Sequence, residues 1–198
     1  MTFKEFYEKN KEYISFNIEN MDFWKKAALS FWYCTKMAKY YSLNQIKYQS
    51  TKYSFPLTVL NILEESITNK SIDTDYYNFL KQSMELEDSM PNYEPNDVLS
   101  SNALDYYTCV YDLIDYLLSK KSDLPVTCCM CYIECVSRDI DELYNLYEII
   151  DYSSERFSET ILKYPEYNDA ITELKKDIEF LTNYSQEKFL SFKKIPLP

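Results

Sequence analysis

The sequence predicts an all-α protein, a single-domain helical bundle of about eight helices over residues 1–198. Two observations favour this class. Apolar residues recur at steps of three and four, which is the period of an amphipathic helix. The chain also has no glycine, a residue on which the tight turns of a many-stranded β protein depend. No internal repeat or domain linker is visible, so we expect one domain.

The central helix is predicted over Trp24–Tyr41, which reads WKKAALSFWYCTKMAKYY. One face mixes a large ring with small residues, so a second helix can approach closely. This face consists of Trp24, Ala27, Ala28, Phe31, Cys34, Thr35 and Ala38. The lysines mostly fall elsewhere and are expected in water: Lys25, Lys26, Lys36 and Lys39. Trp32 is displaced from the stripe, and we expect it to face a second helix or to be partly exposed.

Capping residues place the elements around this helix. Thr2 and Glu5 fit a capping box for a first helix that is interrupted at Asn17–Met21, and Asp22 can cap the central helix. Leu43–Gln49 is predicted as a short separate helix.

The next elements are indicated by a proline and by capping residues. Pro56 suits the first turn of a helix that runs to about Thr68. Thr74 or Asp75 can cap the following helix. Its apolar positions are Tyr76, Phe79, Leu80 and Met84. The prolines and asparagines of Met90–Asp97 predict a loop.

The second half of the chain is predicted in the same way. Asp97 or Ser101 starts a strong helix that ends at Lys120–Asp123. Its apolar stripe is Leu104, Tyr107, Val110, Tyr111, Ile114, Leu117 and Leu118. Pro125 opens a helix that continues towards Ile150. The last elements are a short helix over Ser153–Leu162, a long helix from Pro165 through Phe189, and an extended end over Ile195–Pro198.

Missing residue types restrict the chemistry. Without glycine the chain has none of the loops that usually cradle nucleotide phosphates. The chain also has no histidine, which excludes Ser–His, Cys–His and His–metal sites. Acid–base work would fall to carboxylates, lysine, tyrosine or cysteine. We therefore expect no enzymatic activity, no catalytic residues and no cofactor, with a carboxylate or cysteine enzyme as the alternative.

The cysteines form the sharpest local pattern. Cys128, Cys131 and Cys135 share one helical face, in apolar surroundings. We interpret them as reduced thiols packed in the core, which is common for free cysteine. The alternative is a zinc site completed by Cys34, by Cys109 or by a carboxylate. The Cys-x-x-Cys spacing lacks the βαβ context of a thioredoxin site.

The charge balance indicates the type of partner. The net charge of −11 opposes binding to nucleic acid or to an anionic membrane and favours a basic protein. The N-terminus has no apolar signal segment, and no apolar run approaches the length of a membrane span. We expect a soluble, cytoplasmic protein.

Acidic and aromatic residues together predict a partner-binding surface with aromatic anchors and an acidic rim. The predicted residues are Asp73, Asp75, Tyr76, Tyr77, Glu85, Glu87, Asp88, Tyr93, Glu94 and Asp97. The alternative is that these acids are solvated helix ends and loops. The 21 tyrosines suit a binding surface, and a homodimer stays open, although an AT-rich genome would also explain them.

The chain resembles the YjaG-like family, also called domain of unknown function 416. The resemblance rests on spacing and order over residues 20–190: the central helix with Trp24, Cys34, Met37 and Tyr41, an apolar helix at Leu57–Ile67, and the steps Met90-Pro91, Ala103-Leu104-Asp105 and Lys163-Tyr164-Pro165. It implies one all-helical YjaG-like domain and carries over no enzymatic activity.

Our leading hypothesis is an immunity protein that neutralises a cognate bacterial toxin delivered by contact-dependent growth inhibition. A nuclease toxin, with a tRNA-cleaving one as the specific candidate, would be basic, and an acidic inhibitor would block its active site. The alternative is a housekeeping binding or regulatory protein of the YjaG-like family with no toxin partner.

Overall fold

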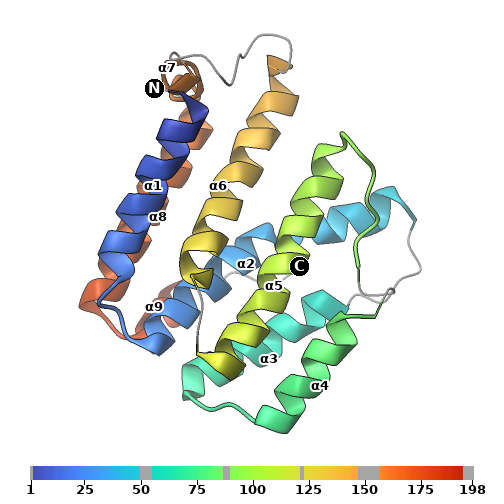
Figure 1. The fold of residues 1–198 in the computed structure, drawn as a ribbon, viewed down its shortest axis with the longest axis vertical. Coiled ribbons are helices and arrows are strands. Elements are labelled where there is room, and N and C mark those ends of the chain that lie inside the picture. Colours follow the sequence, from blue (N-terminus) through green and yellow to red (C-terminus); the bar gives the residue numbers. More distant parts are fainter. Residues whose placement is uncertain (1, 50–54, 87–89, 121–122, 147–156, 194–198) are drawn as a thin grey trace.

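The computed structural model describes residues 2–49, 55–86, 90–120, 123–146 and 157–193, and within them it contains nine α-helices and no strand (Figure 1). The all-α prediction is confirmed. The helices are α1 (Phe3–Ile18), α2 (Phe23–Lys47), α3 (Phe55–Asn69), α4 (Thr74–Met84), α5 (Val98–Ser119), α6 (Leu124–Leu143), α7 (Phe157–Ile161), α8 (Pro165–Asn183) and α9 (Gln186–Phe192).

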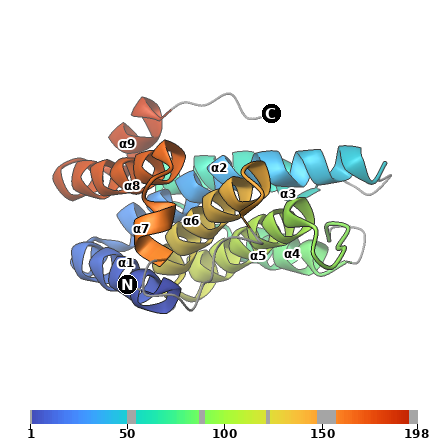
Figure 2. The ribbon, with the colours of Figure 1, turned by 90° about the horizontal axis from the view of Figure 1, so that it is seen from above.

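Helix α2 is the centre of the bundle, as its composition predicts. It packs against α3, α5, α6, α8 and α9 (Figure 2). Every residue from Ala27 to Cys34 is buried, so this part of α2 is enclosed on all sides and the predicted stripe describes only part of its contact surface. Lys36 is also largely buried instead of lying in water. The helix continues without a break to Lys47, so the separate helix over Leu43–Gln49 is wrong.

Side-chain caps fix several helix starts. Thr2 and Glu5 form the predicted capping box, with the Glu5 N–H donating to Thr2 Oγ1 at 3.3 Å. Asp22 accepts from two N–H groups at the start of α2. Asp73, and not Thr74 or Asp75, caps α4, and Asp97 caps α5 as predicted.

Several boundaries in the second half differ from the prediction. Helix α6 ends at Leu143, and Leu104 of the predicted α5 stripe is exposed. Helix α7 covers Phe157–Ile161, and the first residues of its predicted range, 153–156, lie outside the described residues. The predicted last helix is two helices. Tyr184 has an extended backbone, and Ser185 caps α9 by accepting from the Lys188 N–H at 3.2 Å. Because a serine cap satisfies a new helix start, it allows the chain to turn at this point. The predicted extended end, Ile195–Pro198, lies outside the described residues.

Residues other than glycine make the left-handed turns. Gln49, Lys70, Asn96, Lys120 and Asn145 have positive φ. Lys70 follows the last residue of α3, and the Ser71 N–H donates to Ser66 O at 3.0 Å. This bond is the signature of a Schellman motif, in which glycine is the usual residue at the left-handed position. The fold therefore tolerates a side chain where the backbone prefers none.

The arrangement puts α4 and α1 on opposite sides of the molecule (Figures 1 and 2). Helix α4 packs mainly on α5 and α3, whereas α1 packs on α6, α7 and α8. Among the described residues, none of the helices combines the length and the apolar character that crossing a membrane requires.

Candidate protein-interaction surface

The predicted partner-binding residues follow α4 and the segment that leads from it into α5. Asp73, Asp75 and Tyr76 lie at the start of α4, Glu85 at its end, and Tyr93 and Glu94 in the loop before α5. The remaining residues of that prediction differ in accessibility. Glu87 and Asp88 lie outside the described residues.

Tyr77 does not belong to an exposed surface. Its side chain is 1% exposed, and it shares the buried face of α4 with Leu80 and Met84. Adjacent residues on a helix point about 100° apart, so Tyr76 and Tyr77 cannot both face the solvent. Of the two aromatic residues that the sequence predicted for this surface on α4, Tyr76 is the one that a partner could contact.

Phe79 is one of the apolar positions predicted for this helix, but it does not lie in the core. It is 58% exposed, and its ring stacks on that of Tyr76 with centroids 6.5 Å apart. Its position three residues after Tyr76 puts the two on one face. The exposure of Phe79 could have been predicted from the spacing of Tyr77, Leu80 and Met84, which places the buried face on the other side of the helix.

The acidic residues of the predicted surface have different structural roles. Asp73 accepts from the Tyr76 N–H at 3.1 Å and so caps α4. Glu85 Oε1 accepts from the Tyr111 hydroxyl at 2.6 Å, yet Glu85 stays exposed. Asp75 and Glu94 are exposed as well. These exposed carboxylates can attract a basic partner.

Asp97 is held inside a local network. Lys47 Nζ lies 2.7 Å from Asp97 Oδ1, the Tyr48 hydroxyl donates to Oδ2 at 2.7 Å, and Ser100 donates to Oδ2 at 2.6 Å. Partial burial opposes ionisation, but the hydrogen bonds outweigh it and hold the pKa of Asp97 below its usual value of 3.8. Asp97 therefore joins α2 to α5, and its charge is balanced within the fold.

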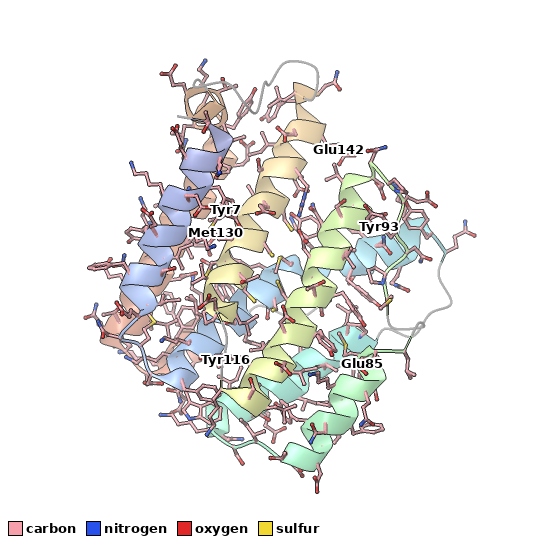
Figure 3. All side chains as sticks on the ribbon, viewed as in Figure 1. Tyr7, Glu85, Tyr93, Tyr116, Met130 and Glu142 are labelled. Carbon is pink, nitrogen blue, oxygen red and sulfur yellow. The ribbon has the colours of Figure 1, made fainter. Side chains whose placement is uncertain are left out.

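The loop that carries Tyr93 is fastened to α2. The buried Asn44 side chain donates to Asn92 O at 2.8 Å and accepts from the Asn92 N–H at 3.0 Å. Tyr93 itself is 56% exposed. Figure 3 shows Tyr93 near the start of α5 and Glu85 on the same side of the molecule beside the lower half of α5. The aromatic and acidic groups thus lie along one side of α5, divided between α4 and this loop.

Negative charge is concentrated in this part of the chain. Residues 55–119, from α3 through α5, contain twelve acidic residues and two lysines, Lys70 and Lys81. This gives −10 of the total −11, and the rest of the chain is nearly neutral, with nineteen basic and twenty acidic residues. Lys81 forms an ion pair with Asp115 and lies over the Tyr111 ring. The α3–α5 segment, about a third of the chain, therefore carries nearly all of the net negative charge, and its exposed acids form an acidic surface.

A second polar cluster lies under α9. Asp177 is 2% exposed and accepts from Trp32 Nε1 at 2.9 Å and from the Tyr33 hydroxyl at 3.1 Å, and Lys193 Nζ lies 2.6 Å from its other oxygen. Burial raises the pKa of Asp177, although Lys193 opposes the shift. Trp32 is buried and faces α8, which is the first of the two positions expected for it. Every member is paired, so the cluster joins α8 and α9 to α2.

The cysteines lie in the core. Cys34 and Cys128 are fully buried, with their sulfurs 3.9 Å apart, and Cys131 is half-buried. Burial raises the pKa of Cys34 and of Cys128. Within the described part of the chain, no three His, Cys, Asp or Glu residues are grouped as metal ligands. Protonated thiols in apolar surroundings act as packing groups.

The fold is similar to that of a solved protein. A DUF416 family protein from Shewanella baltica, known from its crystal structure, superposes with a TM-score of 0.70 over 89% of each chain, at 14% sequence identity. The YjaG-like fold that the sequence pattern implied is thus confirmed. The chain matches no protein-family sequence profile and no curated protein sequence.

Proposed function

We propose that this chain is an immunity protein that binds a basic bacterial toxin and covers its active site with the acidic α3–α5 surface. The observation that carries the proposal is the concentration of −10 charge in residues 55–119, on a surface that also exposes aromatic side chains. Interfaces are enriched in tyrosine and other aromatic residues at their centres, and complementary charge selects the partner.

The chemistry favours a toxin that acts on nucleic acid. A nuclease needs lysine and arginine around its cleft to hold the phosphate backbone. Carboxylates at Asp75, Glu85 and Glu94 offer those cations an alternative to phosphate, and a bound protein excludes the substrate. A tRNA-cleaving nuclease of a contact-dependent growth inhibition system is the specific form that we propose.

A growth assay tests this function. Each toxin-like reading frame beside the gene is expressed in a bacterial host with and without this protein. Rescue of growth by the wild-type chain is the expected result. The double variant Asp75→Lys/Glu94→Lys should associate with the neutralised toxin about tenfold more slowly than the wild type does at low salt, because it removes charges that steer the two proteins together.

The matched control is the double variant Glu8→Lys/Glu12→Lys, at two exposed acids of α1, the helix on the opposite side of the molecule from α4. It changes the net charge in the same direction and should leave association nearly unchanged. Equal effects of the α1 and α4/loop variants, or no neighbouring toxin that the protein neutralises, would refute the proposal.

The second candidate function is that of a housekeeping binding or regulatory protein, for which the same exposed acids and aromatic rings would serve. Such a protein would use the same acidic surface for a cellular partner. A deletion strain separates the two functions. An immunity protein becomes dispensable when the adjacent toxin gene is also deleted, whereas the defect from loss of a housekeeping protein persists.

A further inference from the structure

Helix α4 exposes an ordered aromatic platform. The rings of Tyr76 and Phe79 are stacked, with 17° between their planes, and 42% and 58% of these two residues are exposed. The opposite face of α4 packs into the core through Tyr77, Leu80 and Met84. Two exposed rings in contact on consecutive turns form a continuous apolar surface, unlike a single exposed side chain.

Acidic groups lie at both ends of this platform. Asp73 and Asp75 lie at the start of α4, where negative charge suits the helix dipole. Glu85 lies at the C-terminal end, where its charge adds to that of the last carbonyl groups. The single lysine of α4, Lys81, is turned to Asp115. The exposed face is therefore apolar in the middle and anionic at each end.

We propose that this α4 face is the docking site for a cationic segment of the toxin that presents lysine or arginine beside an apolar side chain. The inference rests on the proposed immunity function and narrows it to one helix. The stems of the basic side chains would cover Tyr76 and Phe79, while their charged ends pair with the carboxylates.

Charge selects this occupant over the others. A second copy that docked α4 against α4 would bring Asp75 and Glu85 of one copy against the same acids of the other. Nucleic acid and anionic lipid are repelled for the same reason. A basic polypeptide is the partner that satisfies both the rings and the acids.

The test titrates the isotope-labelled full chain with a synthetic amphipathic peptide of lysine and leucine, followed by NMR. We expect the largest amide shifts between residues 73 and 86. Phe79→Ala should weaken binding about tenfold or more, as removal of a central aromatic anchor does. The control is Phe16→Ala, a 77% exposed ring on α1, which should leave the affinity within about twofold. Both rings are exposed, so both variants should fold, and circular dichroism checks this.

Three outcomes would overturn the docking site: equal losses in the two variants, shifts centred on α1 or α8, or self-association that Phe79→Ala abolishes in sedimentation velocity. The test also separates this inference from the proposed function. If Phe79→Ala still protects cells from an identified toxin as well as the wild type, the immunity function stands and the α4 site is wrong. If the peptide binds α4 and no toxin is neutralised, α4 still binds a cationic segment, but its partner is not a toxin and the immunity function is wrong.

Discussion

The side-chain amide of Asn44 pairs with the backbone of Asn92 through two hydrogen bonds, of 2.8 and 3.0 Å, across 48 residues of sequence. Asn44 is fully buried on α2, whereas its partner lies in the loop that exposes Tyr93. One amide thus supplies a donor and an acceptor to a loop backbone that has no neighbouring strand to bond with. The position of Tyr93 on the acidic surface depends on this pair.

Replacing Asn44 should therefore loosen the loop and destabilise the fold. Asn44→Ala leaves the Asn92 N–H and carbonyl without their partner, which should lower the free energy of unfolding by about 2–3 kcal/mol. Urea denaturation measures the loss, and hydrogen exchange should show faster exchange of the Asn92 amide. The control is Asn183→Ala, because Asn183 is exposed and bonds only to its own helix. An equal, small effect of both substitutions would contradict the role of Asn44.

The cap at Asp97 should make stability depend on pH. Its folded pKa lies below 3.8, so its contribution is present above pH 3.8 and is lost as the pH falls further. Asp97→Asn keeps a good cap and removes the charge. It should cost about 1 kcal/mol at pH 7 and less at pH 3.

Urea midpoints of wild type and variant at the two pH values test this. The control is Asp123→Asn, since Asp123 begins α6 without a side-chain capping bond. A difference that grows at pH 3 would show that the sign of the Asp97 effect is wrong.

The left-handed residue after α3 offers a stabilising substitution. Lys70 has φ of 54° at the position of the Schellman motif that prefers glycine. Lys70→Gly relieves the contact of its Cβ atom and should raise the free energy of unfolding by about 0.5–1 kcal/mol after the entropy of the unfolded chain is counted. Thermal unfolding measures the gain. Lys70→Ala removes the same charge and keeps Cβ, so it should give no gain, and stabilisation by both would assign the effect to charge.

The buried thiols should be chemically inert in the folded protein. Thiolate is the reactive form, and burial raises the pKa of Cys34 and Cys128. Ellman's reagent should react slowly with the native chain, first at the half-buried Cys131, and with all six cysteines after unfolding in urea. Rapid reaction of several thiols in the native state, or release of zinc in proportion to thiol titration, would contradict the assignment of these cysteines to core packing.

The sequence predicts features of the fold, such as helix caps, that depend on residues close together in the chain. The Thr2–Glu5 capping box, the caps at Asp22 and Asp97, and the central position of α2 follow from short patterns and are confirmed. Burial around a helix is different, because it depends on what packs against each face. Trp32 and Lys36 therefore lie deeper than the stripe of α2 implied.

The candidate surface was only partly predictable. Its acids and Tyr93 follow from composition, but Tyr77 and Phe79 exchange the roles expected of them. In a short helix with aromatic residues on both faces, composition alone does not say which face is buried, and the spacing of Tyr77, Leu80 and Met84 is the pattern that does. The pairing of Asn44 with Asn92 could not be predicted, because the two residues lie far apart in the sequence and no local sequence pattern indicates such a contact.

The uneven division of charge gives the folded molecule a permanent electric dipole moment. Its negative pole lies at α3–α5, whereas the central helix α2 carries five lysines and no acidic residue (Figure 1). In the field of an approaching cation such a molecule rotates before contact, which shortens the orientational search. Anion-exchange resin should adsorb it by the same pole. The protein thus turns its α3–α5 end towards a positively charged partner, whatever the direction from which the partner approaches.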